Sequence, residues 1–274
     1  MGVKVFPCAK INLGLNAVSK RPDGYHNLET IFYPVDIHDE LEVEESDVEG
    51  CRLIISGVQE ICEPSQNLVV KAYNMVCQDY DIPGVKATLT KLLPMQAGMG
   101  GGSSDAAYMI RVLNELFDLR MTKDQMCSYA SRIGADCAFF IEPTPSYAEG
   151  IGDELHPIQL NTLKGKHLVL VKPDVAVSTK EAYAGITPQK PAKNCRKVIC
   201  QPIDTWREEL RNDFEDSVFQ RLPVLAGLKQ SLYDYGALYA AMSGSGSTIY
   251  GIFDEVPSGI IEEYSDIYVK IVDM

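Results

Sequence analysis

Four glycines lie close together at the start of a segment suited to binding an anion. The stretch 94–107, PMQAGMGGGSSDAA, contains Gly98, Gly100, Gly101 and Gly102 and continues with helix-forming residues. The residues before it alternate as in a strand, and apolar residues after it recur at helical spacing. A strand, a glycine loop and a helix in this order direct backbone N–H groups and the positive end of a helix dipole at an anion. The sequence therefore predicts a phosphate-binding loop.

The better-known phosphate loops do not fit this spacing. A P-loop requires a lysine directly after the glycines, and none follows here. The dinucleotide fingerprint and the protein-kinase loop require a glycine at the sixth position from Gly98, where the chain has Ser103. A structural turn is the alternative, but one or two glycines suffice for a turn. Glycines followed by Ser103, Ser104 and Asp105 favour an anion site built from backbone N–H groups.

Three polar residues in apolar surroundings are further candidates for chemistry. Lys10 and Asn12 are two residues apart, so on a strand they point to the same face, which is either an exposed edge or the wall of a site. Asp136 directly precedes the apolar run 137–141. It is either a capping or hydrogen-bonding residue or a functional carboxylate. The residues alone leave both pairs of alternatives open.

Two loop signals accompany these residues. The turn 22–24, PDG, places Tyr25 and His26 at the start of a strand, where they either pack or are presented by the loop. The stretch 243–247, SGSGS, lies between two expected strands and is longer than a tight hairpin requires. It is either an over-long turn or a loop that closes over phosphates.

Composition limits the class of protein. A chain of 274 residues, 46% apolar and 23% charged, is typical of a globular protein and long enough for two domains. A net charge of −13 argues against a broad nucleic-acid-binding face, and it requires a phosphate site to gain positive potential locally. The eight cysteines include no C-x-x-C pair, and their density is far below that of a disulfide scaffold, which predicts reduced thiols in a cytoplasmic protein. Neither a membrane span nor a signal-peptide core is expected.

The elements that must position these residues are strands and helices in mixed order. A strand pair or one long bent strand is expected over 3–18, and single strands are expected over 27–35, 40–45, 51–56, 86–93, 167–171, 237–242, 248–253 and 267–272. Helices are expected after a cap at Ser65, after the glycine loop, from a capping box at Thr122 and Gln125 to Gly134, from about Ser178, and over 205–211 and 223–235. The stretch 188–197 is expected to be an exposed loop. A change in the sequence pattern at 155–165 predicts a domain boundary in an α+β protein.

Taken together, the motifs resemble those of the GHMP kinases, named after galactokinase, homoserine kinase, mevalonate kinase and phosphomevalonate kinase. PMQAGMGGGSSDAA is similar to their phosphate-binding motif, and AKINLGL and MSGSGSTIYGIF are similar to their other two motifs, in the expected order. RPDGYHNLETIF resembles the cytidine-recognition segment of a branch of the family that acts in the non-mevalonate isoprenoid pathway, and GADCAFFI, GIGDEL and NDFE resemble the same branch. The resemblance implies a two-domain GHMP kinase fold: an ATP-binding domain like domain 2 of ribosomal protein S5 over 1–158, and a ferredoxin-like domain over 159–274.

The resemblance also implies an activity and roles for individual residues. It implies an ATP-dependent kinase, with Mg²⁺, that phosphorylates an alcohol group of a cytidine diphosphate-linked sugar alcohol. Lys10 and Asp136 would be the catalytic pair. ATP would contact Asn67, Lys91, Pro94, Gly98, Gly100, Gly101, Gly102, Ser103 and Ser104, one of these two serines also contacting the metal. The substrate would contact Asn12 and Asp136 at its reacting end, Tyr25, His26 and Phe32 around the cytosine, and Thr179 and Tyr183. Gly244, Ser245 and Gly246 would support the phosphates from the second domain.

Some positions depart from the family pattern without removing a functional side chain. Cys137-Ala138 replaces the more usual Val-Pro, Glu142-Pro143 stands where glycine is common, and Met99 replaces leucine. Three other functions remain as alternatives: a homoserine or mevalonate kinase, a phosphorylation-dependent decarboxylase, and a silent nucleotide-dependent regulator. The aromatic and histidine residues at 25–32 argue against the first two, and intact catalytic residues argue against the third. A monomer or weak homodimer with small-molecule partners only, without nucleic acid or membrane, is expected.

Overall fold

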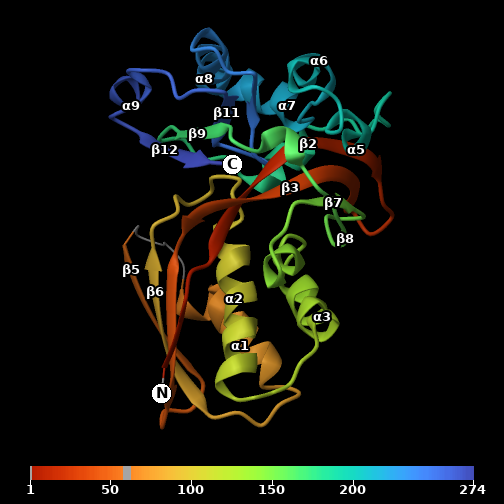
Figure 1. The fold of residues 1–274 in the computed structure, drawn as a ribbon. Coiled ribbons are helices and arrows are strands. Elements are labelled where there is room, and N and C mark those ends of the chain that lie inside the picture. Colours follow the sequence, from red (N-terminus) through yellow and green to blue (C-terminus); the bar gives the residue numbers. More distant parts are fainter. Residues whose placement is uncertain (1, 58–62) are drawn as a thin grey trace. The chain divides into compact units, whose positions relative to one another are not determined.

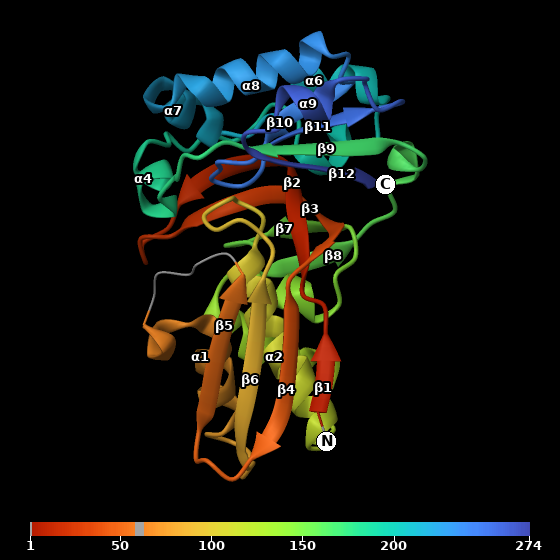
Figure 2. The ribbon, with the colours of Figure 1, turned by 90° about the vertical axis from the view of Figure 1, so that its left-hand side faces the viewer.

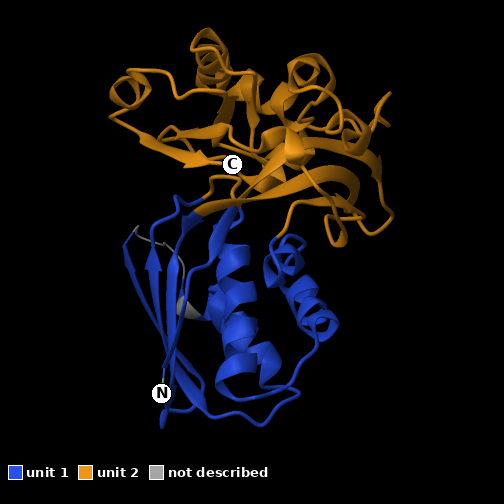
Figure 3. Cartoon of the chain, viewed as in Figure 1, with its two compact units in different colours: residues 1–9, 37–95, 100–143 blue, residues 10–36, 96–99, 144–274 orange. Residues whose placement is uncertain are grey.

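Two compact units make up the chain, and the computed structural model describes residues 2–57 and 63–274 (Figure 1). Unit 1 comprises residues 1–9, 37–95 and 100–143, and unit 2 comprises residues 10–36, 96–99 and 144–274 (Figure 3). Each unit takes segments from distant parts of the sequence. These compact units divide the chain at positions other than residue 158 and are defined by contacts rather than by family domains. The expected division into two family domains at residue 158 therefore stays a prediction.

Unit 1 contains a four-stranded sheet with the order β1-β4-β6-β5 (Figure 2). Its strands are β1 (Gly2–Val5), β4 (Glu40–Ser46), β5 (Cys51–Gly57) and β6 (Gly84–Lys91). β4 pairs antiparallel with β1 and β6, whereas β5 runs parallel to β6. Burial alternates strictly along β6, so Val85, Ala87, Leu89 and finally Lys91 all face inward. The strand period therefore carries a lysine into the interior at the point where the glycine segment begins.

The helices of unit 1 cover one face of this sheet (Figure 1). They are α1 (Leu68–Val76), α2 (Gly101–Leu116) and α3 (Lys123–Ile133), with the short 3-10 turns η1 (Pro64–Gln66) and η2 (Cys137–Ile141). α2 packs against α1, α3 and η2, and its apolar stripe, including Met109, Ile110 and Leu113, is fully buried. The expected strand, glycine loop and helix are therefore confirmed, with α2 starting within the glycines.

Helix caps in unit 1 follow the sequence in one case and differ in another. The capping box is confirmed: Thr122 Oγ1 accepts from Gln125 N and Gln125 Oε1 accepts from Thr122 N, and Gly134 ends α3. The expected cap at Ser65 is wrong. Asn67 is the N-cap of α1, with Oδ1 accepting from Val69 N at 2.8 Å, and Ser65 lies in η1. An asparagine caps as well as a serine does, so two residues of similar propensity compete and the local turn decides.

Unit 2 contains two four-stranded sheets, and β2 and β3 contribute their larger parts to it. The first sheet, β2-β3-β7-β8, comprises β2 (Cys8–Lys20), β3 (His26–His38), β7 (Ser146–Glu149) and β8 (Glu154–Pro157). The second, β10-β11-β9-β12, comprises β9 (His167–Lys172), β10 (Tyr239–Met242), β11 (Ile249–Phe253) and β12 (Tyr268–Asp273). Every pair in the second sheet is antiparallel, which confirms the expected antiparallel α+β arrangement.

Short helices complete unit 2. They are α4 (Thr179–Ala184), α5 (Cys195–Val198), α6 (Trp206–Glu209), α7 (Phe214–Arg221), α8 (Pro223–Asp234) and α9 (Ile260–Glu263), with the 3-10 turns η3 (Asn161–Leu163) and η4 (Ile203–Thr205). α8 packs on β10 and β11 through Leu225 and Leu232. Three sequence expectations need correction: α7, α9, β7 and β8 were not expected, 188–197 includes the start of α5, and 205–211 forms only the short α6. Among the described residues, no helix has the length and apolarity to cross a bilayer.

The capping box of α3 gives a first prediction. Thr122→Ala should lower the free energy of unfolding by about 1 kcal/mol, because the N–H of Gln125 loses its acceptor. Urea unfolding monitored by circular dichroism would measure this loss. Thr187→Ala, at an exposed threonine outside the helices, is the matched control and should change stability by less than about 0.5 kcal/mol. Equal losses in both variants would contradict the box.

Candidate active site

The glycine segment passes through both units. Residues 96–99 belong to unit 2, and the chain re-enters unit 1 at Gly100, where α2 begins. Gly98 has φ +71°, and a Cβ there would lie 2.0 Å from the carbonyl oxygen of Ser243. Ser243 Oγ donates to the Gly98 carbonyl at 2.9 Å. Glycine is therefore required at 98 both by its backbone conformation and by the backbone that lies against it.

In the first turn of α2 the glycines are accessible to solvent, whereas the second serine, Ser104, is buried. Gly102 is exposed and Gly101 is half-buried, so their N–H groups face the N-terminal end of the helix without a side chain of their own. Ser104 is fully buried and its Oγ has no hydrogen-bond partner among the described residues. Ser103 is half-buried and contacts Cys137, whose thiol pKa is raised to about 12 by burial, partly offset by the Ser103 hydrogen bond. This helix start therefore offers backbone donors and one accessible hydroxyl to an anion.

Directly beneath this helix start, one ammonium group lies between two carboxylates. Lys91 Nζ donates to Asp39 Oδ2 at 2.5 Å and to Asp105 Oδ2 at 2.6 Å. The three residues are 0 to 5% exposed. A Cβ on Gly101 would lie 3.5 Å from Lys91 Nζ and 3.7 Å from Asp39 Oδ2. The trio therefore joins the end of β6, the segment before β4 and the first turns of α2 immediately below the glycines.

The two aspartates of the trio are held differently. Asp39 Oδ1 also accepts the backbone N–H groups of Leu92 and Leu93 at 2.6 and 2.8 Å, so its carboxylate receives three donors. Asp105 Oδ1 is buried without a partner among the described residues. Burial raises the pKa of Asp105 to about 7, with Lys91 opposing the rise and Asp39 adding to it. Burial lowers the pKa of Lys91, but both carboxylates outweigh it and the pKa is raised. Asp105 is therefore the carboxyl of the trio whose charged form is disfavoured by its surroundings.

Lys10 and Asn12 form a second polar group, on β2 of unit 2. Both are at most 3% exposed, so the exposed-edge interpretation of this pair is wrong. Lys10 Nζ donates to Asn12 Oδ1 at 2.6 Å, and Asn12 Nδ2 donates to Thr30 Oγ1 at 2.9 Å. Lys10 Nζ also lies 5.0 Å from the ring centroid of Phe32. The period of β2 places both side chains on one face, and the neighbouring strand β3 supplies Thr30 and Phe32.

Asp136 belongs to unit 1 and precedes η2. Its side chain makes no capping hydrogen bond to η2, which removes capping of this turn as an explanation for the aspartate. The carboxylate is half-buried, and the five residues of η2 that follow it are all buried. Lys10 lies in unit 2 and Asp136 in unit 1, so their catalytic pairing stays a prediction.

The aromatic residues of unit 2 form a group at the start of β3. Tyr25 is 58% exposed, directly after the turn, so it is presented by the loop rather than packed in the core. His26 stacks on Tyr183 of α4, with ring centroids 5.2 Å apart, and Tyr183 packs edge-on against Phe214. Burial and then the charge of Lys20 lower the pKa of His26, which favours a neutral imidazole. The structure thus brings Tyr183, far away in the sequence, to His26.

The loop 243–247 is also tied to several candidate residues within unit 2. Thr179 Oγ1 and Ser245 Oγ are 3.2 Å apart. Gly244 has φ +53°, and a Cβ there would lie 3.0 Å from the Gly98 carbonyl and 3.3 Å from Asn12 Oδ1. The loop is therefore more than a turn between β10 and β11, because its backbone packs on the segment 96–99 and beside Asn12.

The sequence predicted most of these candidate residues, but it did not predict the side chains that bind them and hold them in place. Asp39 and Asp105 were not expected to contact Lys91, and Thr30 was not expected to support Asn12. A signal existed for the first group: the alternation of β6 predicts that Lys91 faces inward, and a buried lysine requires an anionic partner. The sequence contains many aspartates, however, and only the fold selects two of them.

Comparison with known proteins places the chain in a family. Residues 67–142 match the profile described as "GHMP kinases N terminal domain", and residues 192–269 match "GHMP kinases C terminal". The chain belongs to the GHMP kinases. A crystal structure of mevalonate kinase from Methanococcus jannaschii, at 13% identity and a TM-score of 0.71, covers 100% of this chain and 98% of its own and shares the fold.

Its closer relatives form one branch of that family. A protein of Bacteroides thetaiotaomicron named 4-diphosphocytidyl-2-C-methyl-D-erythritol kinase is 48% identical over 260 residues, covering 94% of each chain. A protein of the same name from Parabacteroides distasonis is 50% identical over 250 residues, covering 91% of each. The crystal structure of a 4-(cytidine 5'-diphospho)-2C-methyl-D-erythritol kinase superposes with a TM-score of 0.82 at 27% identity, covering 99% of this chain and 100% of its own. The chain is therefore a member of this branch.

The Lys91 trio predicts how stability depends on pH. An acid whose pKa is higher in the folded state stabilises the fold most when protonated, and this contribution is lost as pH rises from about 4 to about 7. The amide of an Asp105→Asn variant stays neutral, so the variant should lose less free energy of unfolding than the natural protein between about pH 5 and about pH 8. Urea unfolding at both pH values measures the difference.

Asp118→Asn is the control for this measurement. It makes the same charge change at a carboxylate whose side chain is 78% exposed and pairs with Arg120. It should leave the pH dependence of stability almost unchanged, because an exposed ion pair contributes little. Identical pH dependence in Asp105→Asn and the natural protein would show that Asp105 is ionised throughout this range.

Proposed function

We propose that the chain transfers the γ-phosphoryl group of ATP to the 2-hydroxyl of 4-diphosphocytidyl-2-C-methyl-D-erythritol, in the non-mevalonate isoprenoid pathway. Its membership of the branch that carries this name, at 42 to 50% identity for several relatives, supports the reaction. The structural observation that carries the substrate assignment is the aromatic group at the start of β3. An exposed tyrosine beside a stacked histidine–tyrosine pair suits a nucleobase, and neither homoserine nor mevalonate has a ring to stack there.

The length of β3 suggests how such a substrate lies in unit 2. His26 and Phe32 are six residues apart on one strand, which corresponds to roughly 20 Å at about 3.3 Å per residue. One base cannot contact both side chains. The cytosine therefore lies at Tyr25, His26 and Tyr183, and Phe32 lies at the alcohol end beside Lys10 and Asn12. The diphosphate spans the strand between them.

Phosphoryl transfer requires few covalent steps from the protein. The substrate hydroxyl oxygen forms a bond to the γ-phosphorus, the bond from that phosphorus to the β–γ bridging oxygen breaks, and ADP leaves with the electron pair. Asp136 orients the hydroxyl and accepts its proton late in the reaction, and Lys10 stabilises the negative charge on the transferred group. Asn12 holds the Lys10 ammonium through the 2.6 Å hydrogen bond. These groups act mainly by positioning and by electrostatics.

The nucleotide contacts centre on the start of α2. The N–H groups of the glycines and the helix dipole hold the phosphates, with Pro94 shaping the segment before them. Asn67 at the cap of α1 and Lys91 lie toward the nucleoside. A lysine has three N–H donors, and the two aspartates take two of those on Lys91. Lys91 therefore acts on ATP mainly by fixing the helix start.

The residues present fit Mg²⁺ that arrives with ATP. No group of three or more His, Cys, Asp or Glu side chains in residues 2–57 and 63–274 forms a metal cage, and magnesium in kinases is held largely by phosphates and water. Ser104 is fully buried and Ser103 is half-buried, so Ser103 is the serine that would offer its hydroxyl to the ion. The ion would neutralise charge on the phosphates. We expect the chain to act as a monomer or weak homodimer.

The reaction is tested by ADP release from MgATP with the cytidine substrate, beside homoserine and mevalonate. Turnover is expected with the cytidine compound alone, because only that substrate has a base for the aromatic group. Lys10→Met and Asp136→Asn should lower kcat by about 10² or more while the fold survives. Lys86→Met, at a half-exposed lysine on β6, is the control and should leave kcat unchanged. Turnover with another alcohol would overturn the substrate assignment.

Base stacking gives a separate prediction. Tyr25→Ala should raise the KM of the cytidine substrate about tenfold or more, because stacking on an aromatic ring contributes roughly 1 to 3 kcal/mol per base. The KM of ATP should not change, since Tyr25 contacts only the cytosine in this proposal. Tyr25→Phe keeps the ring and should retain the natural KM. Steady-state kinetics with each substrate varied would decide, and an unchanged substrate KM in Tyr25→Ala would remove this residue from the site.

A further inference from the structure

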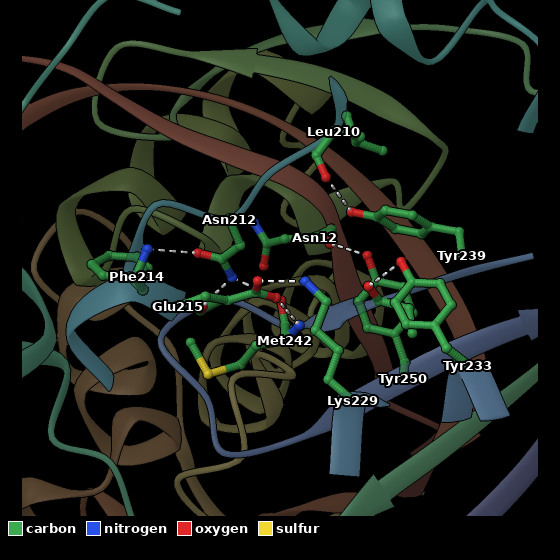
Figure 4. A network of polar contacts seen from close by, with 12 residues as sticks. Asn12, Leu210, Asn212, Phe214, Glu215, Lys229, Tyr233, Tyr239, Met242 and Tyr250 are labelled. Atoms are coloured by element: carbon green, nitrogen blue, oxygen red, sulfur yellow. Dashed lines mark hydrogen bonds and ion pairs between the residues drawn. The ribbon is translucent and has the colours of Figure 1, made fainter. Parts of the chain in front are cut away.

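The segment 212–215, NDFE, is joined to the end of β10 by buried side-chain hydrogen bonds (Figure 4). Asn212 is 3% exposed. Its Nδ2 donates to the carbonyls of Met242 at 2.7 Å and Gly244 at 2.8 Å, and its Oδ1 accepts from Phe214 N at 3.0 Å. Both N–H groups of one amide therefore hold two carbonyls on either side of Ser243, the first residue of the loop 243–247.

Glu215 holds the same strand end from its N–H side. Glu215 Oε1 accepts from Met242 N at 2.8 Å, and Oε2 accepts from Lys229 Nζ of α8 at 2.6 Å. Burial raises the pKa of Glu215, and the charge of Lys229 opposes that rise. Met242 thus has its N–H bound by Glu215 and its carbonyl bound by Asn212, so both backbone polar groups at this residue are fixed by side chains.

The segment that makes these bonds is itself anchored to β2. Leu15 N donates to the Arg211 carbonyl and Asp213 N donates to the Leu15 carbonyl, both at 2.8 Å. Asp213 Oδ2 accepts from Ala17 N at 2.8 Å. β2 also carries Asn12, whose carbonyl accepts from Tyr250 Oη of β11 at 2.7 Å (Figure 4). The loop before α7, the end of β10 and the strand with Lys10 and Asn12 are therefore connected by hydrogen bonds within one unit.

The loop beyond Met242 has little tolerance for movement. Ser243 Oγ donates to the Gly98 carbonyl, and Thr248 N donates to the Ala97 carbonyl at 3.2 Å. Gly244 lies so close to Gly98 and Asn12 that a Cβ would meet both. A shift of the Met242 and Gly244 carbonyls would therefore move the loop against the glycine segment and the substrate-side asparagine together.

We propose that Asn212 and Glu215 are positioning residues that fix the backbone of residues 242–244 and, through it, the loop 243–247 beside the glycine segment. This inference rests on the proposed role of that loop in supporting the phosphates of ATP. In this proposal neither residue touches substrate, because their side chains bind backbone groups and Lys229. Their effect is on the geometry of the transferring group, so it is expected in kcat and in the KM of ATP rather than in cytidine recognition.

Asn212→Asp is the sharpest variant. The carboxylate keeps an oxygen to accept from Phe214 N but loses the N–H groups that bind the Met242 and Gly244 carbonyls. Asn114→Asp is the matched control: Asn114 Oδ1 accepts from Met121 N at 2.8 Å and its Nδ2 donates to the Met121 carbonyl at 3.4 Å, at the far end of α2. Both changes therefore keep an accepted N–H and remove donation to the backbone.

The expected result is a difference between these two variants at equal folding. Asn212→Asp should lower kcat by roughly 10- to 100-fold and raise the KM of ATP, because small misplacement of reacting groups costs about this much. The KM of the cytidine substrate should stay within about threefold. Asn114→Asp should keep the natural kinetics. Hydrogen exchange followed by mass spectrometry should show faster exchange over 243–248 in Asn212→Asp only, where Gly246 N and Thr248 N are hydrogen-bonded.

Glu215 provides a rescue test. Glu215→Gln keeps an oxygen for Met242 N and loses the charge toward Lys229, so it should retain kcat within about threefold. Glu215→Ala removes the acceptor and should lower kcat about tenfold or more, because a buried N–H is left without a partner. A loss in Glu215→Gln as large as in Glu215→Ala would assign the effect to the ion pair and overturn the positioning role of Glu215.

Failure of this inference can be told apart from failure of the proposed function. Normal kcat and normal exchange over 243–248 in Asn212→Asp, with the natural protein turning over the cytidine substrate, would overturn the inference alone. A natural protein that turns over none of the alcohols would overturn the proposed function. In that case the exchange measurement would still test the positioning of the loop. Faster exchange over 243–248 in Asn212→Asp but not in Asn114→Asp would support it, and natural exchange in both variants would overturn it.

Discussion

Backbone contact between Gly98 and Ser243 is the constraint on which the arrangement of unit 2 depends. The approach leaves no room for a Cβ at 98, and a hydroxyl hydrogen bond from Ser243 closes it. Residues 96–99 are thereby held in unit 2, although the strand before them and the helix after them belong to unit 1. Within unit 2, this contact fixes the backbone of residues 96–99, which lead into the glycines at the start of α2.

The two buried lysines, Lys91 and Lys10, differ in their electrostatic surroundings, which matters in an acidic chain of an ATP-dependent kinase family. Lys91 is buried between two carboxylates, which offset its charge, so its contribution is to hold the start of α2 in place. The positive potential at that point then comes from backbone N–H groups and the helix dipole, which cost no desolvated side-chain charge. Lys10 is held instead by the neutral amide of Asn12. Two buried lysines on two units thus have different electrostatic surroundings, and the proposed chemistry uses that difference.

Local features of the fold were predictable because they depend on neighbours in sequence. The strand β6, the helix α2 and the capping box of α3 follow from period, glycine and threonine signals within about ten residues. The cap at Asn67 was missed because Ser65 and Asn67 are equally good caps, and the geometry of η1 decides between them. The short elements α7, β7 and β8 were missed for a related reason: strands of four residues, and a helix that begins with Phe214 and two acidic residues, gain stability from partners distant in sequence.

By itself, the sequence determined the family, the order of the motifs and the candidate residues for the substrates, because these are encoded in short, contiguous stretches. Only the tertiary structure decided which residues hold them. The choice of Asp39 and Asp105 as partners of Lys91, of Tyr183 as partner of His26, and of Asn212 as the donor to Met242 and Gly244 depends on contacts between segments far apart in the chain. A buried charge or carbonyl requires a partner, but any of several residues of the right type could supply it, and packing selects one.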